Sequence, residues 1–165
     1  MHSQAILVLT TGGTIDKNYF DALSEYQIVD SGIPALLKEA RVVLPIRIEE
    51  VCRKDSLELT DADRAEIAQR VSDAPETRIV ITHGTDTMTD TAKVLAAIPG
   101  KTIVLTGALS PARFAETDAP FNLGMAFAAA QVAPPGVYIA MSGQVFDGLK
   151  VRKDRAAGRF VAIAD

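Results

Sequence analysis

Short runs of consecutive apolar residues recur along the chain and mark the strands that we expect. Several of these runs are rich in β-branched residues and do not alternate with polar ones, which is typical of strands buried on both faces of a parallel sheet. The runs occupy residues 5–9, 42–46, 78–82, 102–105 and 137–141.

Segments with helical periodicity separate these runs. In the first, apolar residues recur at i, i+3, i+4 and i+7 from Ile33 to Ala40, and Ser31 precedes them as a candidate cap. Thr60 is the candidate cap of the second helix, and Pro120 opens the last. The helices are expected within residues 33–40, 61–71, 88–98 and 120–130.

The alternation of strands and helices predicts an α/β fold with a doubly wound, mostly parallel sheet flanked by helices. Near the end of the chain, Asp147 and Gly148 lie between short apolar pieces, a pattern that predicts a C-terminal β-hairpin. We expect residues 1–165 to form one domain.

Composition and charge narrow the classes of function. The 17 Lys and Arg against 21 Asp and Glu give a net charge of −4, whereas a nucleic-acid binder would show a basic face. No apolar run approaches the ~20 residues of a membrane helix, and no basic stretch leads the first run as in a signal peptide. We therefore expect no nucleic-acid or membrane partner and a cytoplasmic location. The one cysteine, Cys52, cannot form an internal disulfide and is expected to be a small buried residue.

The turn after the first strand is a candidate site, because ligands of doubly wound sheets bind at the carboxyl ends of the strands. Residues 10–14 read Thr-Thr-Gly-Gly-Thr, and the two glycines let the backbone approach an anion or oxyanion. The segment has neither the P-loop pattern nor the Gly-x-Gly-x-x-Gly fingerprint. A purely structural glycine turn is the alternative.

The turn after the third strand, residues 83–88, gathers polar residues where a ligand crevice is expected. The alternative is that Thr85 or Asp86 only caps the following helix. We expect no metal site at His83, because His2 is the only other histidine and no cysteine cluster exists. We expect His83 to be a structural residue.

Together the two turns resemble the paired signatures of the bacterial-type L-asparaginases. The matching segments are Thr-Gly-Gly-Thr-Ile at residues 11–15 and His-Gly-Thr-Asp-Thr-Met at residues 83–88, each after an expected strand. Asp55-Ser56, residues 118–123 and residues 141–153 also agree with the family pattern. The resemblance therefore covers essentially the whole chain.

This resemblance implies hydrolysis of the side-chain amide of L-asparagine to aspartate and ammonia, without a metal or organic cofactor. Thr14 matches the nucleophile of the family, and Tyr26 matches its activating tyrosine, with Tyr19 as the fallback. Thr85 and Lys153 match two members of a second catalytic triad.

The resemblance also implies the residues that hold the substrate. Asp86, beside Thr85, matches the residue that binds the α-ammonium, and Ser56 matches the one that grips the α-carboxylate. Asp55, Gly13 and Gly84 are expected to complete the substrate site. The usual assembly of the family implies a homodimer or homotetramer.

The chemistry fits these residue types. Acylation of a threonine followed by hydrolysis splits one difficult step into two easier ones, and Tyr26 or Lys153 could accept the hydroxyl proton. Lys153 poses a difficulty, because the neighbouring Asp86 favours the ammonium form whereas a base must be neutral. Either burial prevails or Lys153 acts as a fixed charge.

Family members are commonly about twice as long, and a second domain of a neighbouring subunit adds an acidic residue to the α-ammonium site. We therefore expect weaker and less selective binding here. Leu57 and Ala119 also depart from the family pattern. Three alternatives stay open: a related small-amide hydrolase such as a glutaminase, a non-catalytic module that binds asparagine or aspartate, and a plain α/β domain.

Overall fold

The computed structural model describes residues 5–20, 22 and 24–164, and a six-stranded sheet forms its centre. The sheet order is β4-β1-β5-β6-β7-β8; the first five strands are parallel, and β8 is antiparallel to β7. The predicted doubly wound, mostly parallel α/β fold is confirmed. The strands are β1 (Ile6–Gly12), β4 (Ile46–Lys54), β5 (Arg78–Thr82), β6 (Thr102–Thr106), β7 (Gly136–Met141) and β8 (Gln144–Asp147).

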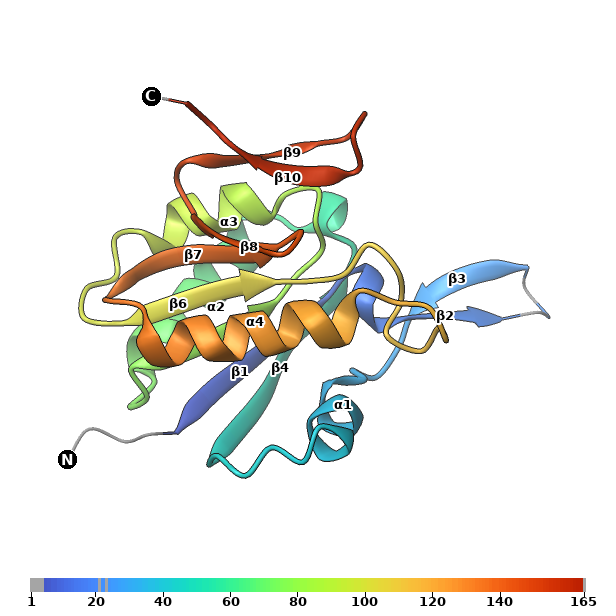
Figure 1. Cartoon of the computed structure of the whole chain (residues 1–165), viewed down its shortest axis with the longest axis horizontal. Coiled ribbons are helices and arrows are strands. Elements are labelled where there is room, and N and C mark those ends of the chain that lie inside the picture. Colours follow the sequence, from blue (N-terminus) through green and yellow to red (C-terminus); the bar gives the residue numbers. More distant parts are fainter. Residues whose placement is uncertain (1–4, 21, 23, 165) are drawn as a thin grey trace.

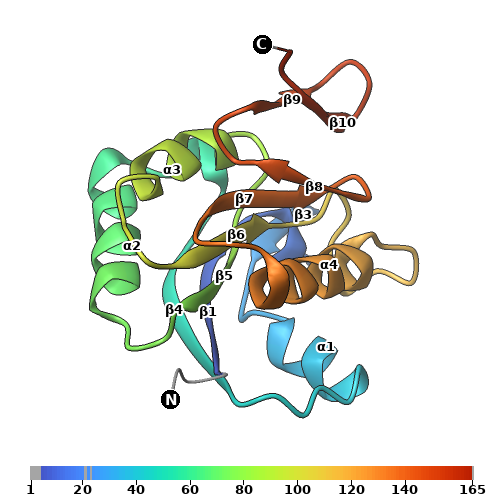
Figure 2. The same cartoon turned by 60° about the vertical axis from the view of Figure 1, so that its left-hand side comes forward.

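Helices cover both faces of this sheet (Figures 1 and 2). On one face lie α2 (Asp61–Asp73) and α3 (Met88–Leu95), and on the other lie α1 (Ile33–Glu39) and α4 (Ala119–Val132). Strand β1 is buried from both sides: Leu7 and Leu9 pack in one apolar cluster, while Ile6 and Val8 pack in the other. This double burial explains why its apolar run does not alternate.

Shorter elements stand outside the central sheet. The 3-10 turns are η1 (Thr14–Asp16) and η3 (Ser56–Glu58), and one hairpin, which the sequence did not predict, is formed by β2 (Lys17–Phe20) and β3 (Glu25–Ile28). A second hairpin consists of β9 (Val151–Asp154) and β10 (Arg159–Ala162). Figure 1 shows the first hairpin projecting from the side of the sheet and the second lying beyond β8. Within the described ranges, no helix is both long and apolar enough to cross a membrane.

The second strand was placed wrongly at residues 42–46, since β4 spans Ile46–Lys54. As an edge strand, β4 leaves many of its charged residues exposed, so it lacks the continuous apolar signal of the central strands. Val42 and Leu44 precede the strand and pack against the apolar cluster that lies between the sheet and helices α1 and α4.

The C-terminal hairpin exists, but its predicted turn at Asp147 and Gly148 is wrong. Chain reversal occurs instead at Ser142 and Gly143, which both have positive φ between β7 and β8, and again before β10. Asp147 accepts a hydrogen bond from the Leu149 amide, and the resulting turn leads the chain out of the sheet. An Asp-Gly pair makes a two-residue hairpin only when both residues adopt positive φ, and Gly148 does not.

Of the two predicted helix caps, Thr60 is confirmed and Ser31 is wrong. Thr60 is the N-cap of α2, where its hydroxyl accepts from the Asp63 amide and the Asp63 carboxylate accepts in return from the Thr60 amide. The N-cap of α1 is Gly32, and no side chain caps this helix. Ser31 stands one residue earlier, where its hydroxyl accepts from the Ile33 amide.

Candidate active site

Three turns at the carboxyl ends of β1, β4 and β5 meet through their backbones. A Cβ added to Gly13, whose φ is +83°, would lie 2.5 Å from the Gly84 nitrogen. A Cβ on Gly84 would lie 2.6 Å from the Ser56 Cβ, and one on Gly12 would lie 2.6 Å from the Lys54 nitrogen. The glycines are therefore required sterically, and they bring the threonine turns that follow β1 and β5 side by side.

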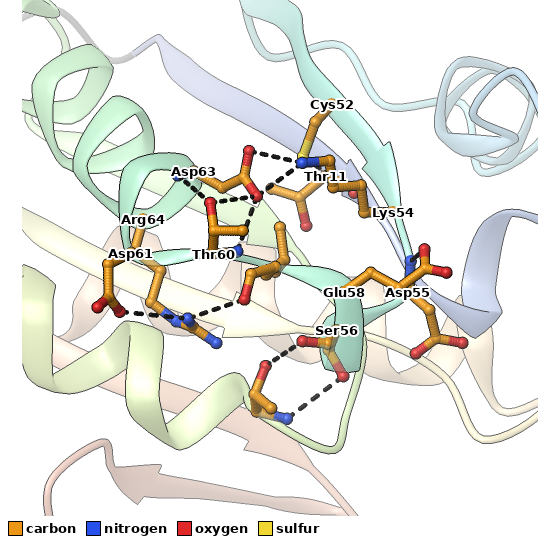
Figure 3. A network of polar contacts seen from close by, with 12 residues as sticks. Thr11, Cys52, Lys54, Asp55, Ser56, Glu58, Thr60, Asp61, Asp63 and Arg64 are labelled. Atoms are coloured by element: carbon orange, nitrogen blue, oxygen red, sulfur yellow. Dashed lines mark hydrogen bonds and ion pairs between the residues drawn. The ribbon is translucent and has the colours of Figure 1, made fainter.

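Ser56 fastens the turn after β4 to the turn after β5 (Figure 3). Its buried hydroxyl accepts hydrogen bonds from the amides of Asp86 (3.1 Å) and Thr87 (3.3 Å), and the Thr87 hydroxyl donates to the Ser56 carbonyl (2.7 Å). Ser56 thus organises the turn that carries Thr85 and Asp86.

The segment around Ser56 is itself held from both sides. Lys54 forms an ion pair with Asp63 (2.8 Å) that links the end of β4 to the start of α2, as Figure 3 shows. Asp55 pairs with Lys17 (2.8 Å) at the start of β2. Burial opposes ionisation of Asp55, but the Lys17 ammonium prevails and lowers the pKa of that carboxyl.

Cys52 was expected to be buried, but it is only half-buried. Its partial removal from water raises the pKa of its thiol.

Lys153 reaches the turn after β5 from strand β9. Its Nζ donates to the Thr85 hydroxyl at 2.7 Å and to the Asp86 carboxylate at 2.9 Å. The predicted cluster of Thr85, Asp86 and Lys153 is therefore brought together, across 68 residues of sequence. The alternative that Thr85 or Asp86 caps α3 is wrong, because Thr87 is the N-cap and no side chain caps the helix.

Thr14 follows Gly13 directly and is half-buried at the start of η1. Tyr26 and Tyr19 face each other across the β2–β3 hairpin, with ring centroids 5.1 Å apart, and Tyr26 also packs on Phe114 at 6.0 Å. Among the described residues, no hydrogen bond joins either tyrosine to Thr14. The structure therefore does not bring the proposed activator to the nucleophile, and the choice between the two tyrosines stays open.

The base of this hairpin is closed by a buried carboxylate. Asp16 accepts from the Ser31 hydroxyl (3.0 Å) and from the Gly32 amide (3.1 Å), which joins the two ends of the segment that carries both tyrosines. Burial raises the pKa of Asp16. The loop before α4 adds a further contact, because the Ala112 amide donates to the Ile15 carbonyl.

Several backbone amides of these turns already have acceptors. The Gly13 amide donates to the Lys54 carbonyl, and the Asp86 and Thr87 amides donate to Ser56. Within the part of the chain that the structure describes, the amides of Thr14 and Thr85 have no acceptor. They are therefore candidate donors to a ligand.

His83 lies fully buried beneath the Thr85 turn. Its Nδ1 is 2.6 Å from the Gly84 carbonyl oxygen, which can only accept, so Nδ1 carries the proton and Nε2 accepts from the Thr91 hydroxyl at 2.7 Å. Thr91 in turn accepts from the buried Arg64. Because desolvation dominates, the pKa of His83 falls to about 4.

The structural role predicted for His83 is confirmed, since both ring nitrogens have protein partners. In the described ranges, no group of three His, Cys, Asp or Glu side chains is arranged to hold a metal ion. His2 lies outside the described residues.

Two nearby residues were missed from sequence. Arg155 contributes a second cation to Asp86, with 3.3 Å between Nη2 and Oδ1, and Phe114 packs on Tyr26. Arg155 lies just past the end of β9, in the turn that leads to β10. No strand periodicity applies to a turn residue, so no sequence signal indicated this contact. Phe114 gave no signal either, because its partner lies in a hairpin that was not predicted.

Hydroxyl, carboxylate and amine groups converging at the carboxyl ends of parallel strands are typical of an α/β enzyme domain. The family model "Asparaginase, N-terminal" matches residues 5–162. This chain therefore belongs to the asparaginase family.

Individual relatives agree with this assignment. The L-asparaginase of Thermococcus kodakarensis is 32% identical over 163 residues, which cover 93% of this chain and 48% of that protein. The glutaminase-asparaginase of Pseudomonas fluorescens is 29% identical over 162 residues, covering 90% and 45% respectively. The solved structure of the thermostable L-asparaginase from T. kodakarensis matches with a TM-score of 0.84 and 30% identity, over 96% of this chain and 51% of that one. The chain spans about half the length of the curated relatives it matches.

Because the two turns are in backbone contact at Gly13, we expect the substitution Gly13→Ala to destabilise the fold strongly. The new Cβ would collide with Gly84 in a backbone conformation that disfavours side chains, so we expect a loss of roughly 2–5 kcal/mol in the free energy of unfolding. Gly100→Ala is the matched control, because Gly100 has φ +73° and open space around it, and it should lose about 1–2 kcal/mol. Urea denaturation measures both; equal losses would contradict the role of the contact.

Because His83 is buried in its neutral form, we expect the protein to lose folding stability in mild acid. The unfolded chain binds a proton near the ordinary pKa of histidine, about 6.5, whereas the folded chain binds it only near about 4. The contribution of neutral His83 to the free energy of unfolding is therefore fully present above about pH 6.5. It is lost as the pH falls from there to about 4, by about 3 kcal/mol in total. Urea denaturation at several pH values should show this slope in the wild type and a smaller one in His83→Asn. Identical slopes would contradict the assignment.

Proposed function

We propose that this chain hydrolyses the side-chain amide of L-asparagine to L-aspartate and ammonia through an acyl-threonine intermediate. The observation that carries the proposal is the backbone contact between Gly13 and Gly84, which sets Thr14 beside a turn where Lys153 touches Thr85 and Asp86. Membership of the family and the names of the relatives support the same reaction.

In the proposed mechanism, the Thr14 hydroxyl attacks the amide carbonyl, and its proton passes through Tyr26 to the leaving nitrogen. Ammonia departs and leaves an ester on Thr14, which water then cleaves to release aspartate and restore the hydroxyl. Tyr26 must approach Thr14 for the first step, so we propose that the β2–β3 hairpin moves over the bound amide. Tyr19 is the alternative activator, since it lies directly opposite on the hairpin.

The free amides of Thr14 and Thr85 are the proposed donors to the tetrahedral oxyanion, where one such donor typically contributes about 3–4 kcal/mol. Lys153 donates to Thr85 and Asp86 at once, which favours its role as a fixed charge over that of a base. Asp86 would hold the α-ammonium by a charge-assisted hydrogen bond.

The remaining residues would shape the substrate site. The three joined turns contain Asp55, Gly13 and Gly84. A substrate bound there would contact mainly backbone atoms. Ser56 is proposed to hold the Asp86 turn, because its oxygen accepts from two backbone amides of that turn. Its remaining hydroxyl proton is proposed to be donated to the α-carboxylate of the substrate.

A related amide hydrolase is the second candidate. The name of the Pseudomonas relative joins glutaminase with asparaginase, and one methylene in a pocket changes discrimination by only about 1–3 kcal/mol. A module that binds asparagine or aspartate without turnover is a third candidate. The contact of Lys153 with the Thr85 hydroxyl speaks against it, because binding alone does not require that pair.

We further propose that residues 1–165 act as a single domain. A cytoplasmic location is proposed because a chain with one cysteine forms no internal disulfide, as is usual for proteins of that compartment. A homodimer or homotetramer is proposed because apolar side chains of α4, among them Phe121 and Val132, are exposed. Gel filtration tests the assembly.

The proposed reaction predicts the kinetics of two variants. Thr14→Ala removes the nucleophile and Thr85→Ala removes the partner of Lys153, so ammonia release from L-asparagine should fall by about a hundredfold or more in each. Thr89→Ala, in the nearby first turn of α3, is the matched control and should retain activity. Assays with L-glutamine in parallel measure selectivity. A wild type that binds asparagine in calorimetry but releases no ammonia would contradict the enzyme and favour the binding module.

A further inference from the structure

Two cations of different character share the Asp86 carboxylate. Lys153 lies 2.9 Å from Oδ1, is 18% exposed and also donates to Thr85. Arg155 lies 3.3 Å from the same oxygen and is 67% exposed. In the described part of the chain, Arg155 makes no other polar contact, so most donors of its guanidinium are free.

The backbone beneath Arg155 is fixed, whereas its side chain is easily redirected. Arg155 follows β9 in a hairpin anchored by the buried Val151 and Phe160, and the Phe160 amide donates to the Ser142 hydroxyl. An exposed ion pair such as that with Asp86 contributes little to stability. Breaking this ion pair therefore requires little free energy, and the guanidinium can turn toward a ligand bound at Asp86.

An α-amino acid presents an ammonium and a carboxylate on the same carbon, and these groups need partners of opposite charge. Asp86 satisfies the ammonium. For the carboxylate, Lys17 is already paired with another acidic side chain, and Lys153 is engaged by Thr85 and Asp86. Of these three cations, this leaves Arg155 as the one with free donors. The fork of an arginine matches a carboxylate with two parallel hydrogen bonds.

We propose that Arg155 binds the α-carboxylate of the substrate in addition to Ser56, while Asp86 binds the α-ammonium, which makes Arg155 a specificity-determining residue. This inference rests on the proposed function, since it takes the substrate to be an α-amino acid amide. The opposing interpretation is that Arg155 only compensates the charge of Asp86 and competes with the ammonium. The two interpretations predict opposite changes in KM when the guanidinium is removed.

The test measures kcat and KM of the wild type and Arg155→Gln on two substrates. These are L-asparagine and its α-amide, in which a neutral group replaces the carboxylate and whose side-chain hydrolysis yields isoasparagine. For L-asparagine, Arg155→Gln should raise KM roughly ten- to a hundredfold with kcat nearly unchanged. For the α-amide, the two proteins should have the same KM. Arg155→Lys, which keeps the charge and loses the fork, should lie between them.

Arg152→Gln is the matched control. Arg152 lies on β9, is 59% exposed and pairs with Asp154 at 3.8 Å, so the same charge is removed without touching Asp86. It should leave both KM values unchanged. Because both arginines are exposed, the variants should fold, which urea denaturation checks.

Three results would overturn the inference: a lower KM for both substrates in Arg155→Gln, an equal rise for both, or no change. A wild type that releases no ammonia would instead contradict the proposed function. In that case calorimetry with L-aspartate and isoasparagine tests Arg155 alone. Weaker binding of L-aspartate only, in Arg155→Gln, would support the inference, and unchanged binding would overturn it.

Discussion

The space between Gly13 and Gly84 is too narrow for any side chain, and the arrangement of the candidate site follows from this backbone contact. Ser56 closes against Gly84 from the other side, so the turns after β1, β4 and β5 form one unit at the carboxyl ends of three adjacent strands. Thr14 and Thr85 each follow one of the contacting glycines. Their proximity is therefore set by the parallel sheet and by two residues without side chains, rather than by contacts of the threonines themselves.

Ionic and hydrogen-bonded partners stabilise this unit. Lys17 holds Asp55, and Lys153 holds Asp86 together with Thr85. Below the Thr85 turn, the neutral His83 orders a chain of hydrogen bonds that ends at the Gly84 carbonyl. The carboxylates are thus fixed by neighbouring cations, and amides that the scaffold does not use are left for a ligand.

The sequence predicted the central architecture because β1, β5, β6 and β7 are buried on both faces and read as continuous apolar runs. It misplaced β4, whose edge position tolerates charged residues, and it missed the β2–β3 hairpin, which is largely exposed. The Asp147-Gly148 turn was assigned wrongly because local composition does not reveal which strand is the partner. The cluster of Thr85, Asp86 and Lys153 was found through the family resemblance, since no local pattern joins residues 68 positions apart. Arg155 was missed because it lies in the turn after β9, where side-chain direction does not follow strand alternation.

The central claim is that the joined turns present Thr14 as the nucleophile of an amide hydrolase. The most direct measurement is intact-mass and peptide analysis of the protein quenched in acid during turnover of L-asparagine. The account predicts an aspartyl ester on the peptide that contains Thr14, and no ester in Thr14→Ala. Ammonia release accompanied by an ester on Thr85, or undiminished release by Thr14→Ala, would contradict it.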